Sequence, residues 1–448
     1  MNKGKLFQST VVAALAGFIF GFDMVVISGA DKPIQTLWNT TPLFHGFFIM
    51  SMALWGTVIG SVFAGAPTEK YGRKKVLIWL GVMFIASAIG SALAQDPYTF
   101  SFFRLIGGIA IGVSSVAAPT YISEISNKNN RGKLVGMYQF NIVFGILIAY
   151  LSNYFLAGFG GINDWRWMLA VLLIPSLIYT LMTLGLPESP RWLLSVKNDE
   201  EAARKNLQEI GVEEIDETIG EIKISNELDK AHGAVSLFTP QHRKIISIAF
   251  FVAFFNQASG INFLLYYAPR ILEEAGFPKD NSLLSSISLG MMNLVFTFVG
   301  LWLIDRIGRK TLLIIGSFGY IISLSMVAYG FVAHGAPAFM LSFLLLFIAS
   351  HAIGQGAVIW VLISEIFPTP IRAKGQAFGA SVHWVFAALI TLITPVFLDK
   401  DHGIFKENPW PIFAFFAVMM ALQLVWILAK VPETKGVSLE DLQKKLAQ

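Results

Sequence analysis

The sequence predicts an all-α membrane protein of twelve transmembrane helices arranged as two six-helix bundles. Its 448 residues are 55% hydrophobic and only 14% charged, whereas ordinary soluble domains carry about 25% charged residues. Six apolar runs precede a polar stretch near the middle of the chain and six follow it. Each run has close to the ~20 residues that a helix needs to cross ~30 Å of hydrocarbon. Short motifs also recur in the two halves.

The recurring motifs indicate that the two halves are related by duplication. Three pairs occur in the same order and at a similar offset: EKYGRKK (69–75) with DRIGRKT (305–311), SEISNKNNR (123–131) with SEIFPTPIR (364–372), and LPESP (186–190) with VPETK (431–435). We therefore predict an N-terminal six-helix bundle, a cytoplasmic helical bridge, a C-terminal six-helix bundle and a cytoplasmic tail, at residues 1–186, 187–242, 243–434 and 435–448.

The charge distribution predicts the orientation and disfavours several classes of function. The formal net charge is +4, but the basic residues lie in short clusters between apolar runs, which argues against nucleic-acid binding. Because such basic loops are normally cytoplasmic, both termini are expected in the cytoplasm. The chain has no cysteine, so disulfides and thiolate metal sites are excluded. We expect no cofactor and no metal site.

The first apolar run, about residues 9–30, carries one charge, Asp23. The run has no convincing small-residue cleavage site, so we interpret it as an uncleaved span rather than a signal peptide. A charge in mid-membrane costs at least ~2.5 kcal/mol and normally faces a partner or a water-filled pathway. Asp23 is therefore a candidate functional residue. The alternative is a structural carboxylate capped by a neighbouring helix.

The second run, about residues 45–66, is rich in small residues that let another helix approach closely; they are Gly56, Gly60 and Gly65. A tight basic turn separates it from the third run, about residues 76–95. This turn is expected to be cytoplasmic.

The fourth run, about residues 98–122, places Arg104 among apolar residues, as the only basic residue that we expect within the first six runs. An arginine stays charged, so beside Asp23 it would keep the carboxylate ionised while close and release it on withdrawal. Such a pair can act as a proton switch. The alternative is a permanent ion pair that only fixes helix orientation.

The fifth run, about residues 134–158, carries Gln139 one turn inside the membrane, and the sixth run ends near residue 186. The bridge that follows is expected to form short helices. Ser189 before Pro190 is typical of a helix N-cap, and Asn198 with Glu201 resembles a capping box.

The second half accumulates polar side chains inside its apolar runs. The seventh run reads FFNQASGINFLLYYAPR, and later runs add further amide and aromatic groups; the candidates are Asn256, Gln257, Asn262, Tyr266, Tyr267, Asn293, Trp360, His383 and Trp384. Single amides in membrane helices often serve only as interhelical hydrogen bonds. A cluster beside Gly260 favours a binding site. Amides and indole faces suit a neutral polyhydroxylated ligand, and the runs lack the lysine and arginine cluster that an anion would need.

Nine motifs together resemble the sugar porter family of the major facilitator superfamily. They occur in this order: GFDMVVISG, EKYGRKK, FFRLIGG, SEISNKNNRGKL, PESPRWLL, NQASGINFLLYYAP, DRIGRK, WVLISEIFPTPIR and VPETKG. The pattern is most similar to bacterial sugar-proton symporters. The resemblance implies the major facilitator fold, alternating access to a central cavity, and a location in the bacterial inner membrane.

The resemblance also implies roles for individual residues. Sugar contacts are implied for Gln139, Gln257, Asn262, Asn293 and Trp360, and closure of the outer side for Tyr266. Asp23 and Arg104 match the proton-coupling pair, whereas uniporting relatives carry an uncharged amide at the first position. A cytoplasmic charge network that latches the outward-open state is implied for Arg73, Glu124, Arg131, Arg309, Glu365 and Arg372.

Three positions depart from the family pattern: Asn256 replaces one of a pair of glutamines, His383 replaces Gln or Asn, and Ala357 replaces a proline. The first two change donor reach in the predicted pocket, and the third changes how the tenth helix bends. We predict a proton-coupled hexose or pentose symporter that works as a monomer and is not an enzyme. The alternatives are a facilitative sugar uniporter and, third, a transporter-like sugar sensor.

Overall fold

The computed structural model describes residues 3–126, 130–231 and 236–437, and every regular element among them is helical. Eleven helices in this part of the chain are long and apolar enough to cross a membrane, and a bent pair, Pro42–Met50 with Met52–Phe63, makes a twelfth. The prediction of an all-α protein with twelve spans is confirmed. The last residues of the predicted tail, 438–448, lie outside the described residues.

The chain forms two compact units. Unit 1 comprises residues 1–24, 55–149 and 166–235, and unit 2 comprises residues 25–54, 150–165 and 236–448. Four helices pass from one unit into the other along the chain: α1 (Lys3–Trp38), α3 (Met52–Phe63), α7 (Arg131–Leu156) and α8 (Asp164–Ala170).

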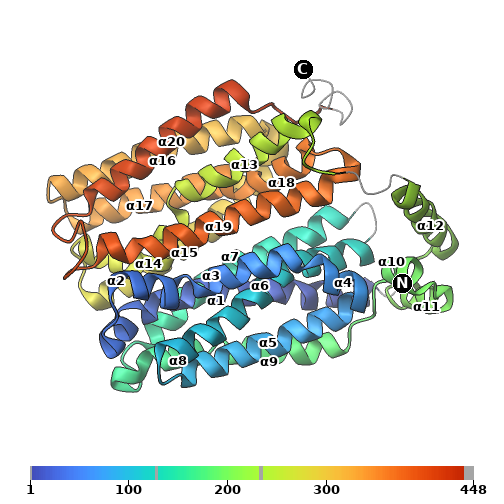
Figure 1. The fold of residues 1–448 in the computed structure, drawn as a ribbon, viewed down its shortest axis with the longest axis horizontal. Helices are drawn as coiled ribbons and strands as arrows, with labels where there is room; N and C mark the ends of the chain where they lie inside the picture. Colours follow the sequence, from blue (N-terminus) through green and yellow to red (C-terminus); the bar gives the residue numbers. More distant parts are fainter. Residues whose placement is uncertain (1–2, 127–129, 232–235, 438–448) are drawn as a thin grey trace. The chain divides into compact units, whose positions relative to one another are not determined.

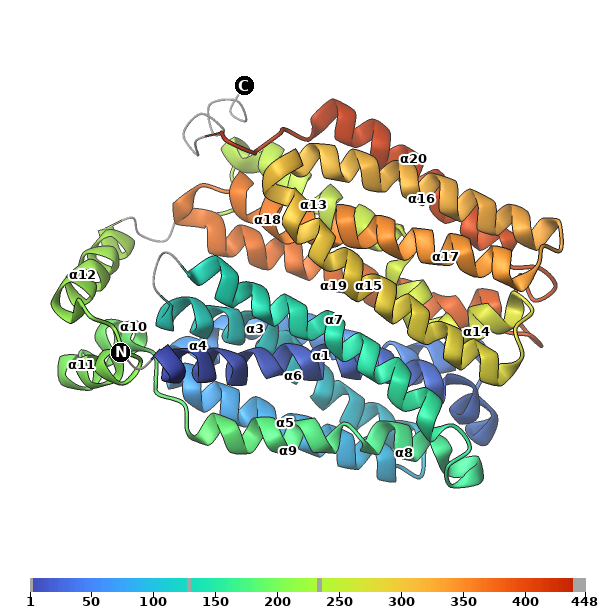
Figure 2. The ribbon, with the colours of Figure 1, turned by 180° about the vertical axis from the view of Figure 1, so that it is seen from behind.

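Unit 1 is built around α5 (Arg73–Leu93), which packs against α6 (Pro97–Ile125) and α9 (Leu173–Leu184), as Figure 2 shows. Its other complete elements are α4 (Gly65–Tyr71), α10 (Pro190–Trp192), η3 (Leu193–Lys197), α11 (Glu200–Glu209) and α12 (Ile215–Ala231). Lys5, at the start of α1, lies 3.2 Å from Glu209 of α11. The bridge helix α11 therefore lies at the same end of unit 1 as the start of α1.

Glycines determine how closely the helices of unit 1 approach. A Cβ added at Gly56 would lie 2.4 Å from the carbonyl oxygen of Leu105, and one at Gly60 would lie 2.3 Å from that of Ile109. Only glycine lets α3 and α6 meet at this distance. Gly65, in contrast, has open space where a Cβ would stand.

In unit 2, whose later helices are orange and red in Figure 1, α16 (Arg309–Val332) packs against α17 (Pro337–His351) and α20 (Trp410–Lys430). In the same unit, α13 (Arg243–Ala258) packs against α19 (Arg372–Leu398). The other elements of unit 2 are α2 (Pro42–Phe44), η1 (His45–Met50), η2 (Gly161–Asn163), η4 (Pro240–His242), α14 (Ile261–Glu274), α15 (Lys279–Ile307), η5 (Ala352–Gly356), α18 (Ala357–Ile366) and η6 (Thr369–Ile371). Large apolar side chains are exposed on the outside of α16 and α20, among them Phe318, Ile322, Leu422 and Val425. Such a surface is stable against lipid.

Two spans of unit 2 are interrupted near polar side chains. Gly260 has φ +88° and separates α13 from α14, and a Cβ there would lie 2.8 Å from the ring of Phe416. The tenth span widens into a π-helical turn, η5, between α17 and α18. Irregular backbone of this kind is tolerated in a membrane only inside the protein or beside a cavity.

Two predictions of detail are wrong. The first span does not end near residue 30: α1 continues to Trp38, because the chain leaves the helix only at Asn39, which has φ +44°. Asp31 and Lys32 therefore lie in the same helix as Asp23, which is not its only charge. In the bridge, Ser189 caps α10 as predicted, but α11 is capped by Asp199, since Asn198 adopts a left-handed conformation (φ +52°) one residue earlier.

Candidate functional site

Unit 1 contains a buried ion pair between α1 and α6. Asp23 and Arg104 are each 1% exposed. An Nη atom of Arg104 lies 2.5 Å from Asp23 Oδ1, and the other Nη donates to the Asp23 carbonyl oxygen at 3.2 Å. The second carboxylate oxygen, Oδ2, accepts no hydrogen bond from the described residues. The structure thus brings together the two charges singled out in the sequence and leaves one buried oxygen of Asp23 without a hydrogen bond from the described residues.

In unit 2, three amides next to the Gly260 break are joined by hydrogen bonds. Asn262 donates to Gln257 Oε1 at 2.9 Å, and Gln257 Nε2 donates to Asn256 Oδ1 at 2.9 Å. All three side chains are buried. The left-handed turn at Gly260 positions Asn262, at the start of α14, over Gln257, at the end of α13.

His383 of α19 extends this amide chain toward two indoles. Its ring nitrogens lie 3.1 and 3.3 Å from Gln257 Nε2. The His383 ring centroid is 5.1 Å from that of Trp360 and 4.6 Å from that of Trp384. The structure therefore assembles Asn256, Gln257, Asn262, His383, Trp360 and Trp384 into one cluster, which we call the amide-indole cluster. It combines donors, acceptors and flat apolar faces.

The remaining predicted binding residues lie on other helices. Tyr266 is fully buried in α14, next to a kink at Tyr267 (φ −118°, ψ 19°) and three residues before Pro269. Asn293 is buried in α15. Gln139 is half-buried on the part of α7 that belongs to unit 1.

The predicted cytoplasmic charges form one ion pair in each unit. In unit 1, Arg73 lies 2.7 Å from Glu124. In unit 2, Arg309 lies 2.8 Å from Glu365. Arg131 is exposed at the start of α7, and Arg372 donates from Nε to the Phe367 carbonyl oxygen at 3.3 Å.

Each pair is completed by a PES or PET motif whose role the sequence analysis missed. The Glu188 carboxylate accepts from the backbone N–H groups of Arg73 and Lys74, and Ser189 donates to Glu124 at 2.5 Å. In unit 2, the Glu433 carboxylate likewise accepts from the backbone N–H groups of Arg309 and Lys310, and Thr434 donates to Glu365 at 2.6 Å. The repeat of Glu followed by Ser or Thr was the signal that could have revealed them.

The carboxylates of these motifs cap helix N-termini. α5 and α16 both begin after a glycine with positive φ, Gly72 at +92° and Gly308 at +101°, which turns the first N–H groups toward the glutamate. Burial raises the pKa of Glu188, although the N–H groups of Ser189, Lys74 and Arg73 and the charge of Arg73 oppose this. A negative group at a helix N-terminus is favourable.

Comparisons with known proteins identify the family. The family described as "Sugar (and other) transporter" matches residues 9–446. The chain belongs to this sugar porter family of the major facilitator superfamily. It is 33% identical to the arabinose-proton symporter of Bacillus subtilis (strain 168) over 99% of this chain and 95% of that protein, and 33% identical to the D-xylose-proton symporter of Escherichia coli (strain K12) over 99% and 96%.

Solved structures agree with this assignment. The partially occluded inward-open conformation of the xylose transporter XylE from E. coli is 32% identical, with a TM-score of 0.85 over 97% of this chain and 100% of that chain. The XylE structure bound to 6-bromo-6-deoxy-D-glucose gives a TM-score of 0.81 over 100% of both chains. The sugar porter therefore has the major facilitator fold, is an integral membrane protein, and is a transporter rather than an enzyme.

Proposed function

We propose that this sugar porter is a proton-coupled symporter of a neutral hexose or pentose in the bacterial inner membrane, acting as a monomer. The observation that carries the proposal is the buried Asp23–Arg104 pair, whose Asp23 Oδ2 accepts no hydrogen bond from the described residues. A carboxylate with one oxygen held by arginine and the other without a hydrogen bond is suited to gaining and losing a proton. The arabinose, xylose and galactose relatives are named as proton symporters.

The proposed cycle uses the ion pair as its switch. Asp23, facing outside, takes up a proton at Oδ2 and weakens its bond to Arg104, because a neutral carboxyl binds a guanidinium less strongly. Sugar binds at the amide-indole cluster, together with Gln139, Asn293 and Tyr266. The bundles, which we take as residues 1–186 and 243–434 joined by the bridge 187–242, then open to the cytoplasm. Renewed contact with Arg104 expels the proton.

The test of this function is uptake by proteoliposomes of radiolabelled hexoses and pentoses. We expect at least one neutral sugar to accumulate above its external concentration when the outside is acidic, and to equilibrate only when the pH gradient is absent. A protein that equilibrates sugar but never accumulates it is a uniporter. A protein that binds sugar without flux is a sensor.

The proposed orientation, with both termini in the cytoplasm, predicts which end of α5 faces the cytoplasm. Lys75 lies in the first turn of this helix, Gln95 lies two residues after its last residue, and both are exposed. Because the chain lacks cysteine, Gln95→Cys and Lys75→Cys can be labelled singly in right-side-out vesicles. An impermeant reagent is expected to label position 95 at once and position 75 only after permeabilisation. The reverse pattern would invert the topology and place both termini outside.

The two proposed cytoplasmic ion pairs, Arg73–Glu124 and Arg309–Glu365, are expected to stabilise the outward-open state as a latch. One exposed ion pair contributes only ~0 to 1 kcal/mol, but each pair here is held by a further hydroxyl from Ser189 or Thr434 and a helix-capping glutamate. We therefore expect Glu365→Gln to increase the labelling, from the cytoplasmic side, of single cysteines introduced into the predicted central cavity. Unchanged labelling would make these residues structural caps only.

A further inference from the structure

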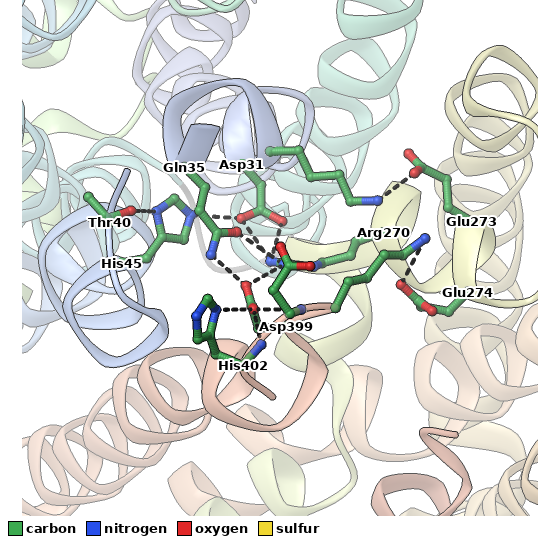
Figure 3. Close-up of polar contacts among 12 residues, drawn as sticks. Asp31, Gln35, Thr40, His45, Arg270, Glu273, Glu274, Asp399 and His402 are labelled. Atoms are coloured by element: carbon green, nitrogen blue, oxygen red, sulfur yellow. Dashed lines mark hydrogen bonds and ion pairs between the residues drawn. The ribbon is translucent and has the colours of Figure 1, made fainter. Parts of the chain in front are cut away.

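Unit 2 contains a further buried ionic cluster, near the C-terminal ends of α14 and α19 (Figure 3). It joins α1 and η1 to α14 and to the residue that follows α19. We call it the outer cluster, because the proposed topology places it at the extracellular side. Its members are Asp31, Gln35, His45, Arg270 and Asp399.

Arg270 is at the centre of the outer cluster. Its guanidinium lies 3.2 Å from Asp31 Oδ2, 3.0 Å from Gln35 Oε1 and 3.3 Å from Asp399 Oδ2. Gln35 also donates to Asp399 at 2.6 Å. With the bundles taken for the proposed function, residues 1–186 and 243–434, opening this end to the outside breaks these contacts. Asp31 and Gln35 then belong to the first bundle, and Arg270 and Asp399 to the second.

His45 completes the outer cluster with a ring that can hold one proton or two. Its Nε2 lies 2.8 Å from Asp31 Oδ1, and its Nδ1 lies 3.0 Å from the Thr40 hydroxyl. A carboxylate only accepts, so Nε2 carries a hydrogen. The Thr40 hydroxyl can donate to a bare Nδ1 or accept from a protonated one, so a second proton fits without rearrangement.

The charges of the outer cluster balance only when His45 is protonated. Asp31, Asp399 and Arg270 are 1%, 5% and 4% exposed, and His45 is 0% exposed. Burial tends to raise the pKa of Asp399, but the N–H of His402, the Gln35 amide, the N–H of Asp401 and Arg270 hold it below its usual range. Two carboxylates against one guanidinium leave one negative charge, and a buried uncompensated charge is costly.

The charged groups around the outer cluster do not supply the missing positive charge. Lys32 pairs with Glu273, and Lys400 lies 3.4 Å from Glu274, so each pair is neutral. Tyr267 donates its hydroxyl to the Thr391 carbonyl oxygen and is uncharged. His402, whose ring lies 3.6 Å from Asp399, and Asp401 are both exposed and screened by water.

We propose that the outer cluster is a proton-binding extracellular gate, in which closure takes up a proton at His45 and opening releases it to the outside. This proton is distinct from the one assigned to Asp23. The proposal rests on the alternating access of the proposed function. Since the closed state holds one more proton, the ratio of closed to open protein changes by up to about tenfold for each pH unit, and acid favours closure.

The test measures gate opening directly, without transport. Spin labels on Leu43→Cys and Glu407→Cys, both exposed positions at this end of unit 2, report the distance between first-half and second-half segments. The Asp23→Asn protein serves as background, so that the titration of Asp23 cannot contribute. Raising the pH from about 5 to about 8 is expected to move the population from short to long distances.

Two variants of similar size are expected to act in opposite directions. His45→Gln keeps a donor for Asp31 but never the positive charge, so the long distance should dominate at every pH. Asp31→Asn removes one negative charge, so the cluster is neutral without the proton and the short distance should dominate at every pH. His402→Gln, at an exposed neighbour, should keep the pH response of the parent.

Three results would overturn the gate. The first is a parent protein whose distances do not respond to pH, and the second is a His45→Gln protein that keeps the parent response. The third is an Asp31→Asn protein that opens as His45→Gln does, which would mean that the residues only provide packing. None of these readouts requires sugar flux. The gate can therefore be refuted while the symport function stands, and the symport function can be refuted while the gate stands.

Discussion

Asp23→Asn is expected to abolish accumulation of sugar while leaving exchange of sugar across the membrane intact. The asparagine mimics the protonated carboxyl, so sugar can bind and the bundles can move, but no proton accompanies it. One charge crossing 100 mV corresponds to ~2.3 kcal/mol, or a concentration ratio of roughly fifty. Proton-driven accumulation should therefore fall by about that factor, to equilibration.

The experiment compares counterflow and uphill uptake in the same proteoliposomes. Glu201→Gln is the matched control, since it makes the same chemical change at an exposed residue of the bridge and should accumulate sugar as the parent does. Undiminished uphill uptake by Asp23→Asn would show that the proton travels elsewhere. Loss of both exchange and uptake would assign Asp23 to helix packing, the structural alternative that the sequence left open.

Gln257→Ala is expected to reduce sugar binding below detection. Gln257 accepts from Asn262 and lies within hydrogen-bonding distance of Asn256 and His383, so its removal both deletes a ligand contact and leaves its neighbours without a partner. A buried polar group left unsatisfied costs ~1 to 3 kcal/mol, and two or more such groups amount to a loss of about a hundredfold or greater. Trp360→Ala should have a comparable effect by removing the stacking face.

The control for this prediction is Gln423→Ala in α20. Gln423 is also a buried amide in a membrane helix, but it donates to Ser317 at 3.2 Å, which is an interhelical bond. Its loss should lower thermal stability and leave the sugar affinity unchanged. Equal losses of affinity in the two variants, measured by titration calorimetry, would remove the amide-indole cluster from the binding site. His383→Gln should change the ranking among sugars, because it alters donor reach toward the ligand.

The sequence alone determined the membrane class, the twelve spans and the internal duplication, because long apolar runs and repeated motifs do not depend on tertiary contacts. It also allowed the pairing of Asp23 with Arg104 to be predicted, since an ionised group deep in a membrane needs a counter-charge and only one was expected nearby. The amides around Gly260 could be recognised for the same reason: polar groups in hydrocarbon require partners.

Contacts between segments far apart in the sequence were decided only by the tertiary structure. The repeated PES and PET motifs could be found in the sequence, but it does not show that Glu188 and Glu433 cap α5 and α16. The outer cluster was missed for a different reason. Asp31, Arg270 and Asp399 lie near helix ends, where the sequence permits either hydration or burial. A charge at a helix end becomes a buried, functional group only when another part of the chain covers it, and that is a property of packing between distant segments.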